Sequence, residues 1–140
     1  MIIIQVISWP RCLRKLKKPL QLSFHNYNHA IVADNQFMTD MSDALRKAAL
    51  EALVPGLNEM QMVTVSFDAG HAHSAQPLND DTTCCLVVSA LFDIPERTKE
   101  HRDRLANSLK DAAKRLLPSE WKVEVVITRF NPEIESFVSG

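Results

Sequence analysis

The sequence predicts an α+β fold in which two consecutive βαβ units (βαββαβ) form one sheet, with two helices covering one of its faces. Residues 80–130 support this prediction most strongly, because their hydrophobic side chains follow a strand pattern, then a helical spacing, then strict alternation. Residues 29–67 repeat the same order in a weaker form. A helical connection between two strands of one sheet leaves those strands parallel, so each unit predicts one parallel pair.

The second unit has the clearer pattern. Residues 82–92 are rich in β-branched and apolar side chains, which favours a largely buried strand. Residues 98–117 predict a helix in which Thr98 is the N-cap and Pro118 forces the end. Its buried stripe is formed by Leu105, Leu109, Ala112 and Leu116. Residues 121–130 alternate between apolar and polar side chains and predict the last strand.

The first unit is the weaker of the two. The short apolar run 29–34 is expected to be its first strand, and Thr39 or Asp40 is expected to cap the helix that follows. Pro55 ends that helix, and residues 61–67 alternate as expected for a second strand, parallel to the first.

The predicted domain organisation is an N-terminal extension, residues 1–28, followed by the βαββαβ domain, residues 29–140. The extension has no acidic residue and a cluster of basic ones, formed by Arg11, Arg14, Lys15, Lys17 and Lys18. A loosely packed terminal arm explains this composition most simply, and a functional basic patch is the alternative. The alternating residues 20–24 suit an edge strand or an arm that contacts another subunit.

The composition is that of an ordinary globular protein. The 140 residues are 46% hydrophobic and 24% charged, and the formal net charge of −1 gives no general reason to expect a nucleic-acid partner. No apolar run is long enough to span a bilayer. Cys84 and Cys85 are neighbours on a predicted strand, so their side chains face opposite sides and do not readily form a disulfide. We therefore expect a soluble cytoplasmic protein without a membrane or nucleic-acid partner.

No cofactor or metal site is predicted. The sequence has no P-loop, no GxGxxG and no GxSxG motif, which leaves nucleotide binding and serine hydrolysis without support. His71 and His73 would lie on one side of an extended segment, but two ligands are too few for a metal site. The segment 69–81 that contains them is expected to be a polar connection between the two units.

Three segments resemble a known family. Residues 92–102 (Phe-Asp-Ile-Pro-Glu-Arg-Thr-Lys-Glu-His-Arg) resemble the strand exit of the 5-carboxymethyl-2-hydroxymuconate isomerases, where an Arg followed by Ser or Thr opens the second helix. Residues 29–35 are similar to the family's opening strand, and residues 125–137 to its last strand and C-terminal tail. This resemblance, over about residues 29–137, favours the double βαβ arrangement of the tautomerases over a ferredoxin-like sandwich.

The resemblance implies a function for the chain. Tautomerase-superfamily members form trimers around a central barrel, and an N-terminal proline, whose amine pKa an apolar pocket brings near neutrality, acts as general base. The implied activity is keto–enol tautomerisation of a small unsaturated keto acid in aromatic catabolism. Here Asn28 precedes the predicted first strand where the family has its proline, and Pro19 is an amide unless the chain is cut after Lys18. The alternatives are therefore a non-enzymatic oligomeric module of the same topology and a ferredoxin-like binding domain.

Three residues are candidates for the site. Arg97, carried over from the resemblance, has a guanidinium that can hold a substrate carboxylate bidentately where a strand meets a helix. A solvated arginine at a helix start is the plain alternative. Arg129, at the end of the last strand, is the second choice for the same carboxylate. His29 is a possible substitute base because its pKa is normally near neutral, and a surface histidine at a subunit contact is the alternative.

Overall fold

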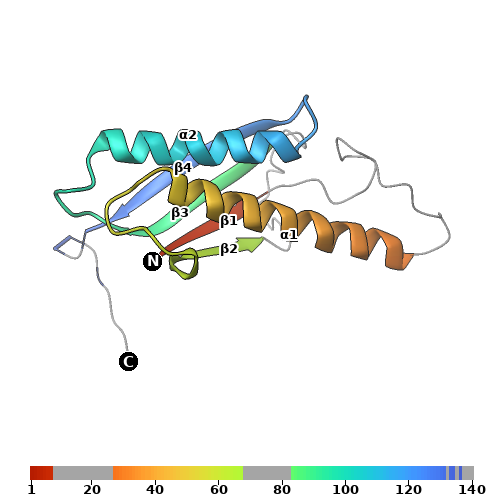
Figure 1. Cartoon of the computed structure of the whole chain (residues 1–140), viewed down its shortest axis with the longest axis horizontal. Helices are drawn as coiled ribbons and strands as arrows, with labels where there is room; N and C mark the ends of the chain where they lie inside the picture. The colour runs from red at the N-terminus through yellow and green to blue at the C-terminus, as the bar shows by residue number, and fades with distance from the viewer. Residues whose placement is uncertain (8–26, 68–82, 132, 135, 137–140) are drawn as a thin grey trace.

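The computed structural model describes residues 1–7, 27–67, 83–131, 133–134 and 136, with only the backbone described for residues 27–34. In chain order its elements are β1 (Ile2–Ile7), α1 (Tyr27–Glu51), the short 3-10 helix η2 (Met60–Met62), β2 (Val63–Phe67), β3 (Thr83–Phe92), α2 (Lys99–Leu116) and β4 (Lys122–Phe130). Figure 1 shows both helices on one face of a single sheet. The predicted α+β architecture, with its two helices on one face, is therefore confirmed.

The sheet topology is a double βαβ. The strand order is β2-β1-β3-β4, with β1 parallel to β2 and β3 parallel to β4, while the two central strands β1 and β3 are antiparallel. The two strands of each unit are therefore direct neighbours. In a ferredoxin-like sandwich each βαβ unit is split by a strand from the other unit, so this chain does not have the ferredoxin-like topology.

The predicted position of the first strand is wrong. Residues 29–34 lie within α1, which begins at Tyr27, so Thr39 and Asp40 are in the middle of that helix and do not cap it. The first strand is Ile2–Ile7, from the segment predicted to be an extension, and it occupies a central place in the sheet. A short apolar run fits a strand or a buried helical segment equally well, and alanine-containing runs such as 29–34 favour a helix.

The core lies between the helices and the sheet. Alternate residues of β1 point into it, so that Ile2, Ile4 and Val6 are buried whereas Ile3 and Gln5 are exposed. The helices contribute a buried stripe each, which includes Met41, Leu45, Ala49, Leu105, Leu109 and Ala113. No helix in the described part of the chain is long and apolar enough to cross a membrane.

The predicted N-cap of α2 is confirmed. Thr98 Oγ1 accepts a hydrogen bond from the backbone N–H of His101, and the N–H of Thr98 donates to His101 Nδ1 at 3.2 Å. This reciprocal pair is a capping box with a histidine at its third position. It fixes where α2 begins, after the loop 93–98 that follows β3.

Side chains of α2 hold the C-terminal end of α1. Ser108 Oγ donates to the carbonyl of Ala48 at 2.7 Å, and Arg104 Nε donates to the carbonyl of Ala52 at 2.8 Å. The Ala48 carbonyl also accepts the backbone N–H of Ala52 at 3.2 Å, and a cation such as Arg104 near a helix C-terminus is favoured by the helix dipole. Leu53 follows with a φ of 55°, in the left-handed region that commonly ends a helix.

A β-bulge interrupts β3 near its end. Val88 pairs with Ile127 and Leu91 with Arg129, so β3 has one more residue than β4 between these two pairs. Ala90 takes up the extra length with a φ of 63°, and Thr128 Oγ1 donates to the carbonyl of Val88 at 2.9 Å.

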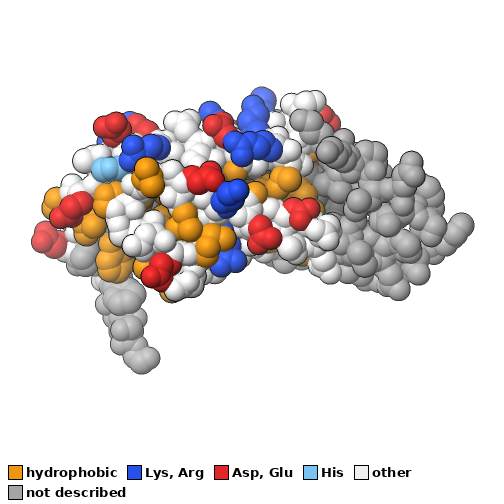
Figure 2. Space-filling view, viewed as in Figure 1, with side chains coloured by type: hydrophobic (Ala, Val, Ile, Leu, Met, Phe, Trp, Pro, Cys, Tyr) orange, Lys and Arg blue, Asp and Glu red, His pale blue; other side chains and the backbone are white. Residues whose placement is uncertain are grey.

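The other face of the sheet is not covered by any described element. Ile3 and Val126 lie on this open face with 37% and 48% of their surface exposed. They are mixed with polar side chains such as Gln5, Thr64 and Glu124. Figure 2 shows the opposite, helix-covered face, on which acidic and basic side chains are intermixed.

Candidate functional site

A cavity of about 440 Å³ lies between the first turns of α2 and the second half of β4. We call it the cationic pocket, and its lining residues are Lys99, Arg102, Asp103, Ala106, Val125, Ile127 and Arg129. Three cationic side chains therefore face a single carboxylate. The N-terminal end of α2 adds the positive end of its helix dipole, so the electrostatics of the pocket favour a small anion.

Arg129 enters the pocket from the end of β4. Its Nη1 lies 3.5 Å from Asp93 Oδ2, and the two side chains are 52% and 29% exposed. An exposed ion pair of this length contributes little to stability. A ligand carboxylate that accepted two guanidinium hydrogen bonds would compete with Asp93 effectively.

Arg102 and Lys99 enter from α2, three residues apart on one side of the helix. Arg102 Nη1 donates to the backbone carbonyl of Arg97 at 2.7 Å, and the residue also lines the pocket. Lys99 Nζ lies 2.6 Å from Asp103 Oδ2, in a pair that is largely exposed. Of the two cations, Arg102 has the better defined position, because its side chain is half-buried and tied to the backbone.

The remaining wall of the pocket is apolar. Val125 and Ile127 are two and four residues before Arg129 on β4, so they face the same side as Arg129, whereas Val126 faces the other side. Ala106 of α2 stands opposite them. A small organic acid would thus find cationic groups for its charged end and a hydrocarbon surface for the rest.

Arg97 does not line the cationic pocket. Its Nε donates to the carbonyl of Pro55 at 2.9 Å and its Nη1 to the carbonyl of Phe92 at 3.0 Å. The side chain therefore joins the turn after α1 to the end of β3. Its role as a carboxylate ligand stays a prediction, as does that of Arg129, although Arg129 does lie in the pocket.

The structure does not bring His29 to the pocket of its own chain. His29 lies near the start of α1, whereas the pocket lies at the start of α2, and Figure 1 shows the two helices beginning at opposite ends of the sheet. The role of His29 as a base stays a prediction.

His71 and His73 fall outside the described residues. Within the described residues, no group of three or more His, Cys, Asp or Glu side chains is placed to hold a metal.

The residue that precedes the first strand is not the one that the sequence analysis predicted. Asn28 lies in α1, so it does not correspond to the residue before the opening strand. Met1 occupies that position, next to Ile2 at the start of β1, and it is 72% exposed. The proline that the family resemblance implies at this point is therefore absent from both places.

The two cysteines of β3 differ in environment. Burial, with a smaller contribution from Cys85, raises the pKa of Cys84 to about 12, so its thiol stays protonated at neutral pH. Cys85 is half-buried on the open face, where burial and then the Glu124 carboxylate raise its pKa. Neither environment activates a thiol as a nucleophile.

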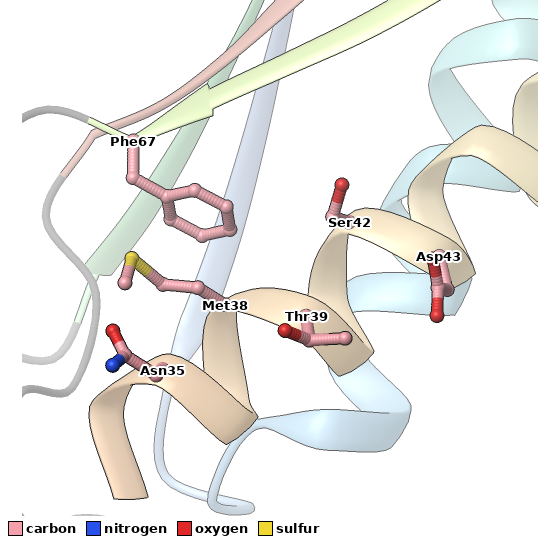
Figure 3. A pocket seen from close by; sticks show the side chains of 6 residues that line it. All are labelled: Asn35, Met38, Thr39, Ser42, Asp43 and Phe67. Atoms are coloured by element: carbon pink, nitrogen blue, oxygen red, sulfur yellow. The ribbon is translucent and has the colours of Figure 1, made fainter. Parts of the chain in front are cut away.

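A second cavity of about 380 Å³ lies along α1 beside the end of β2 (Figure 3). Phe67 and Met38 face each other across it, and the rest of its lining is Asn35, Thr39, Ser42 and Asp43. It contains a carboxylate and no cation, so its lining does not favour an organic acid.

The sequence analysis did not identify Lys99, Arg102 or the apolar wall. Two signals for them were available. Lys99 and Arg102 are spaced by one helical turn at the start of a predicted helix, and Val125, Ile127 and Arg129 share one face of a predicted strand. What the sequence does not reveal is that this helical turn and this strand face lie against each other.

Comparisons with known proteins identify the fold. No family model and no curated protein matches the chain. Among solved structures, a domain of unknown function (DUF1904) from Sebaldella termitidis is similar with a TM-score of 0.56 and 13% identity, covering 98% of this chain and 95% of that one. FG41 malonate semialdehyde decarboxylase inhibited by 3-bromopropiolate is similar with a TM-score of 0.53 and 15% identity, covering 100% and 90%. Native fused 4-OT is similar with a TM-score of 0.51 and 14% identity, covering 92% and 87%.

These neighbours have the tautomerase fold, and the predicted tautomerase-like double βαβ is thereby confirmed. At such low identity the likeness extends to the fold alone. The closer resemblance to 5-carboxymethyl-2-hydroxymuconate isomerases stays a prediction.

Proposed function

We propose that this chain is an isomerase of the tautomerase fold that binds a small unsaturated keto acid by its carboxylate and catalyses keto–enol tautomerisation in the cationic pocket. The observation that carries the proposal is the placement of Lys99, Arg102 and Arg129 around one cavity whose opposite wall is apolar. This combination suits a hydrocarbon acid better than inorganic phosphate, which would gain nothing from Val125 and Ile127.

The chemistry requires a proton acceptor and a cation near the substrate oxygen. In ketonisation the enol hydroxyl loses its proton and the neighbouring carbon gains one, so no co-reactant is consumed. Arg102 or Arg129 would stabilise the negative charge that develops on the oxygen. No proline stands at the start of β1, so we assign the proton-accepting role to Asp103, whose carboxylate lines the pocket beside Lys99. His29 would have to reach the pocket from a neighbouring subunit.

The proposed assembly is a homotrimer in which the open sheet faces line a shared interior. One similar solved structure, with a TM-score of 0.50 and 11% identity, is a fused 4-OT described as an asymmetric trimer. The exposed Ile3 and Val126 on the open face support burial of this face in an assembly.

We also propose a cytoplasmic location, since Cys84 and Cys85 are free thiols. The proposed metabolic context is the degradation of aromatic compounds.

Ketonisation of phenylenolpyruvate, followed by the loss of enol absorbance, tests the activity. We expect Arg129→Ala and Arg102→Ala to raise KM at least about tenfold, because each removes charged hydrogen bonds to the substrate, and the variant that loses the cation beside the reacting oxygen should lower kcat as well. Asp103→Asn should instead lower kcat with little change in KM. Lys122→Ala, at the other end of β4 and outside the pocket, is the control. A wild-type rate equal to that of buffer would rule out the activity.

A non-enzymatic module is the second candidate, and the absence of a proline at the start of β1 favours it. Met1 occupies the position before the strand, where the family resemblance implies the catalytic amine. Such a module would bind phenylpyruvate, the stable keto acid, without accelerating ketonisation. Binding by isothermal titration calorimetry, combined with the kinetic assay, separates the two candidates.

A further inference from the structure

We infer that Arg97 is a positioning residue that sets the geometry of the cationic pocket from the turn after α1. The inference rests on the proposed function in one respect, since the affinity of the pocket for a carboxylate is one of its readouts. It assigns Arg97 a role through Arg102 and Arg129 rather than through contact with the ligand.

The first step is the way in which the Arg97 side chain is held. Its Nε donates to Pro55 O at 2.9 Å, across 42 positions of sequence, and its Nη1 donates to Phe92 O at 3.0 Å. A planar guanidinium donates in two fixed directions at once, which a lysine ammonium cannot reproduce. Arg97 therefore fixes the distance between the turn after α1 and the end of β3, which carry these carbonyls.

The second step is the close fit of this guanidinium against Gly56. Gly56 has a φ of +81°, and a Cβ at this position would lie 3.0 Å from Arg97 Nη2. A side chain at position 56 would have two effects at once. It would strain the backbone of the turn, and it would displace the Arg97 guanidinium. The turn after α1 and the Arg97 side chain thus behave as one unit.

The third step links this unit to the pocket. The carbonyl of Arg97 accepts the 2.7 Å hydrogen bond from Arg102 Nη1, so the backbone at position 97 determines where Arg102 lies. The N–H of Asp93 donates to Phe130 O at 2.7 Å, and the Asp93 carboxylate pairs with Arg129. The loop between β3 and α2 therefore holds both arginines of the pocket, and Arg97 anchors that loop.

A test uses two changes that perturb Arg97 differently. Arg97→Ala removes the guanidinium, and Gly56→Ala displaces it without altering any charge or any residue of the pocket. Arg97→Lys keeps the charge but not the paired hydrogen bonds. We expect all three to weaken binding of phenylpyruvate about tenfold and to move the Arg102 guanidinium NMR signals of the ligand-free protein.

Two controls separate positioning from general loss of stability. Lys47→Gly lowers the helix stability of α1 at an exposed site away from the loop, and Leu53→Ala alters an exposed side chain of the same turn. Neither is expected to change phenylpyruvate affinity by more than about twofold. If Arg97→Ala fails to fold, Gly56→Ala and Arg97→Lys carry the test.

The outcomes that overturn the inference are distinct from failure of the proposed function. Unchanged affinity and unchanged Arg102 signals in folded Gly56→Ala and Arg97→Lys would refute it. The inference would also be refuted if the NMR signal of Arg97 Nε–H in the wild type shifted on phenylpyruvate binding while Gly56→Ala bound phenylpyruvate with unchanged affinity. Arg97 would then be a ligand. If wild-type protein does not bind phenylpyruvate but the Arg102 signals still move in Gly56→Ala, the proposed function fails and the positioning role stands.

Discussion

Ile4 of β1 lies opposite Val88 of β3 in the antiparallel ladder at the centre of the sheet, and both side chains are fully buried. On its other side, Ile4 pairs with Val65 in the parallel ladder of β1 and β2. The first residues of the chain are thus part of the core that supports both βαβ units.

Shortening Ile4 should therefore reduce the free energy of unfolding in proportion to the methyl groups removed. We expect Ile4→Val to cost about 0.5–1.5 kcal/mol and Ile4→Ala about 2–5 kcal/mol, as measured for buried aliphatic side chains. Urea denaturation followed by circular dichroism measures both losses. If neither variant differs from wild type, β1 does not contribute to the core.

Leu53 offers an opportunity to stabilise the chain. It is 72% exposed and has a φ of 55°, which costs a residue with a Cβ about 1–2 kcal/mol. Leu53→Gly removes this strain and should raise the free energy of unfolding by up to about 1 kcal/mol. Lys47→Gly, in the regular part of α1, should lower it by about the same amount. A loss of stability in both variants would show that the backbone at position 53 is not left-handed.

Cys84 should make stability depend on pH in the alkaline range. The folded-state pKa is raised from 9.0 to about 12, so the folded chain keeps a proton that the unfolded chain loses within this window. The free energy of unfolding therefore falls as the pH rises above about 9, by up to about 1.4 kcal/mol per pH unit. The contribution is absent below pH 8, where both states are protonated.

The comparison of wild type with Cys84→Ala isolates this contribution. Thermal melts between pH 8 and 10.5 should show a steeper decline for wild type, because the variant has no thiol to ionise at position 84. Cys85 is retained in both proteins and cancels in the difference. Parallel declines would contradict the burial of Cys84.

A charge on the open face should prevent assembly. Val126→Asp would place a carboxylate in the shared interior of the proposed trimer, where its desolvation is costly. Size-exclusion chromatography with light scattering should then report a trimer for wild type and a monomer for the variant. Lys47→Asp, on the exposed side of α1, is the control and should leave the trimer intact. A monomeric wild-type protein would contradict the proposed assembly.

The second βαβ unit could be predicted from sequence because its signals are local. The apolar stripe of α2, its Thr98 cap and the alternation of β4 all lie within single elements. The position of β1 was missed because residues 1–28 were assigned to an extension and the short apolar run 29–34 was taken as the first strand, although such a run fits a buried helical segment as well. Pairing with two neighbours at once decides the choice, and pairing is a property of the assembled sheet.

The candidate site was predicted only in part, for a related reason. Arg129, whose role as a ligand stays a prediction, was singled out because it lies at the end of the last strand, and it does line the pocket. Arg102 reaches the same cavity only because α2 packs over β4, and Arg97 contacts Pro55 from 42 positions away. Contacts of this kind depend on the relative placement of elements, which no pattern within one segment encodes.

The single extra residue at Ala90 lets β3 stay in register with the shorter β4. Ser89 and Ala90 lie together between the buried residues Val88 and Leu91, and they occupy the place that Thr128 alone occupies on β4. Deleting Ala90 should therefore restore regular alternation, with Leu91 still buried and Phe92 still opposite Phe130, whose ring centroid is 5.1 Å away. Deleting Ser89 and Ala90 together should instead turn Leu91 outward and Phe92 inward and move Asp93 away from Arg129, so that the length of this short stretch sets the entrance of the basin where an acid would bind.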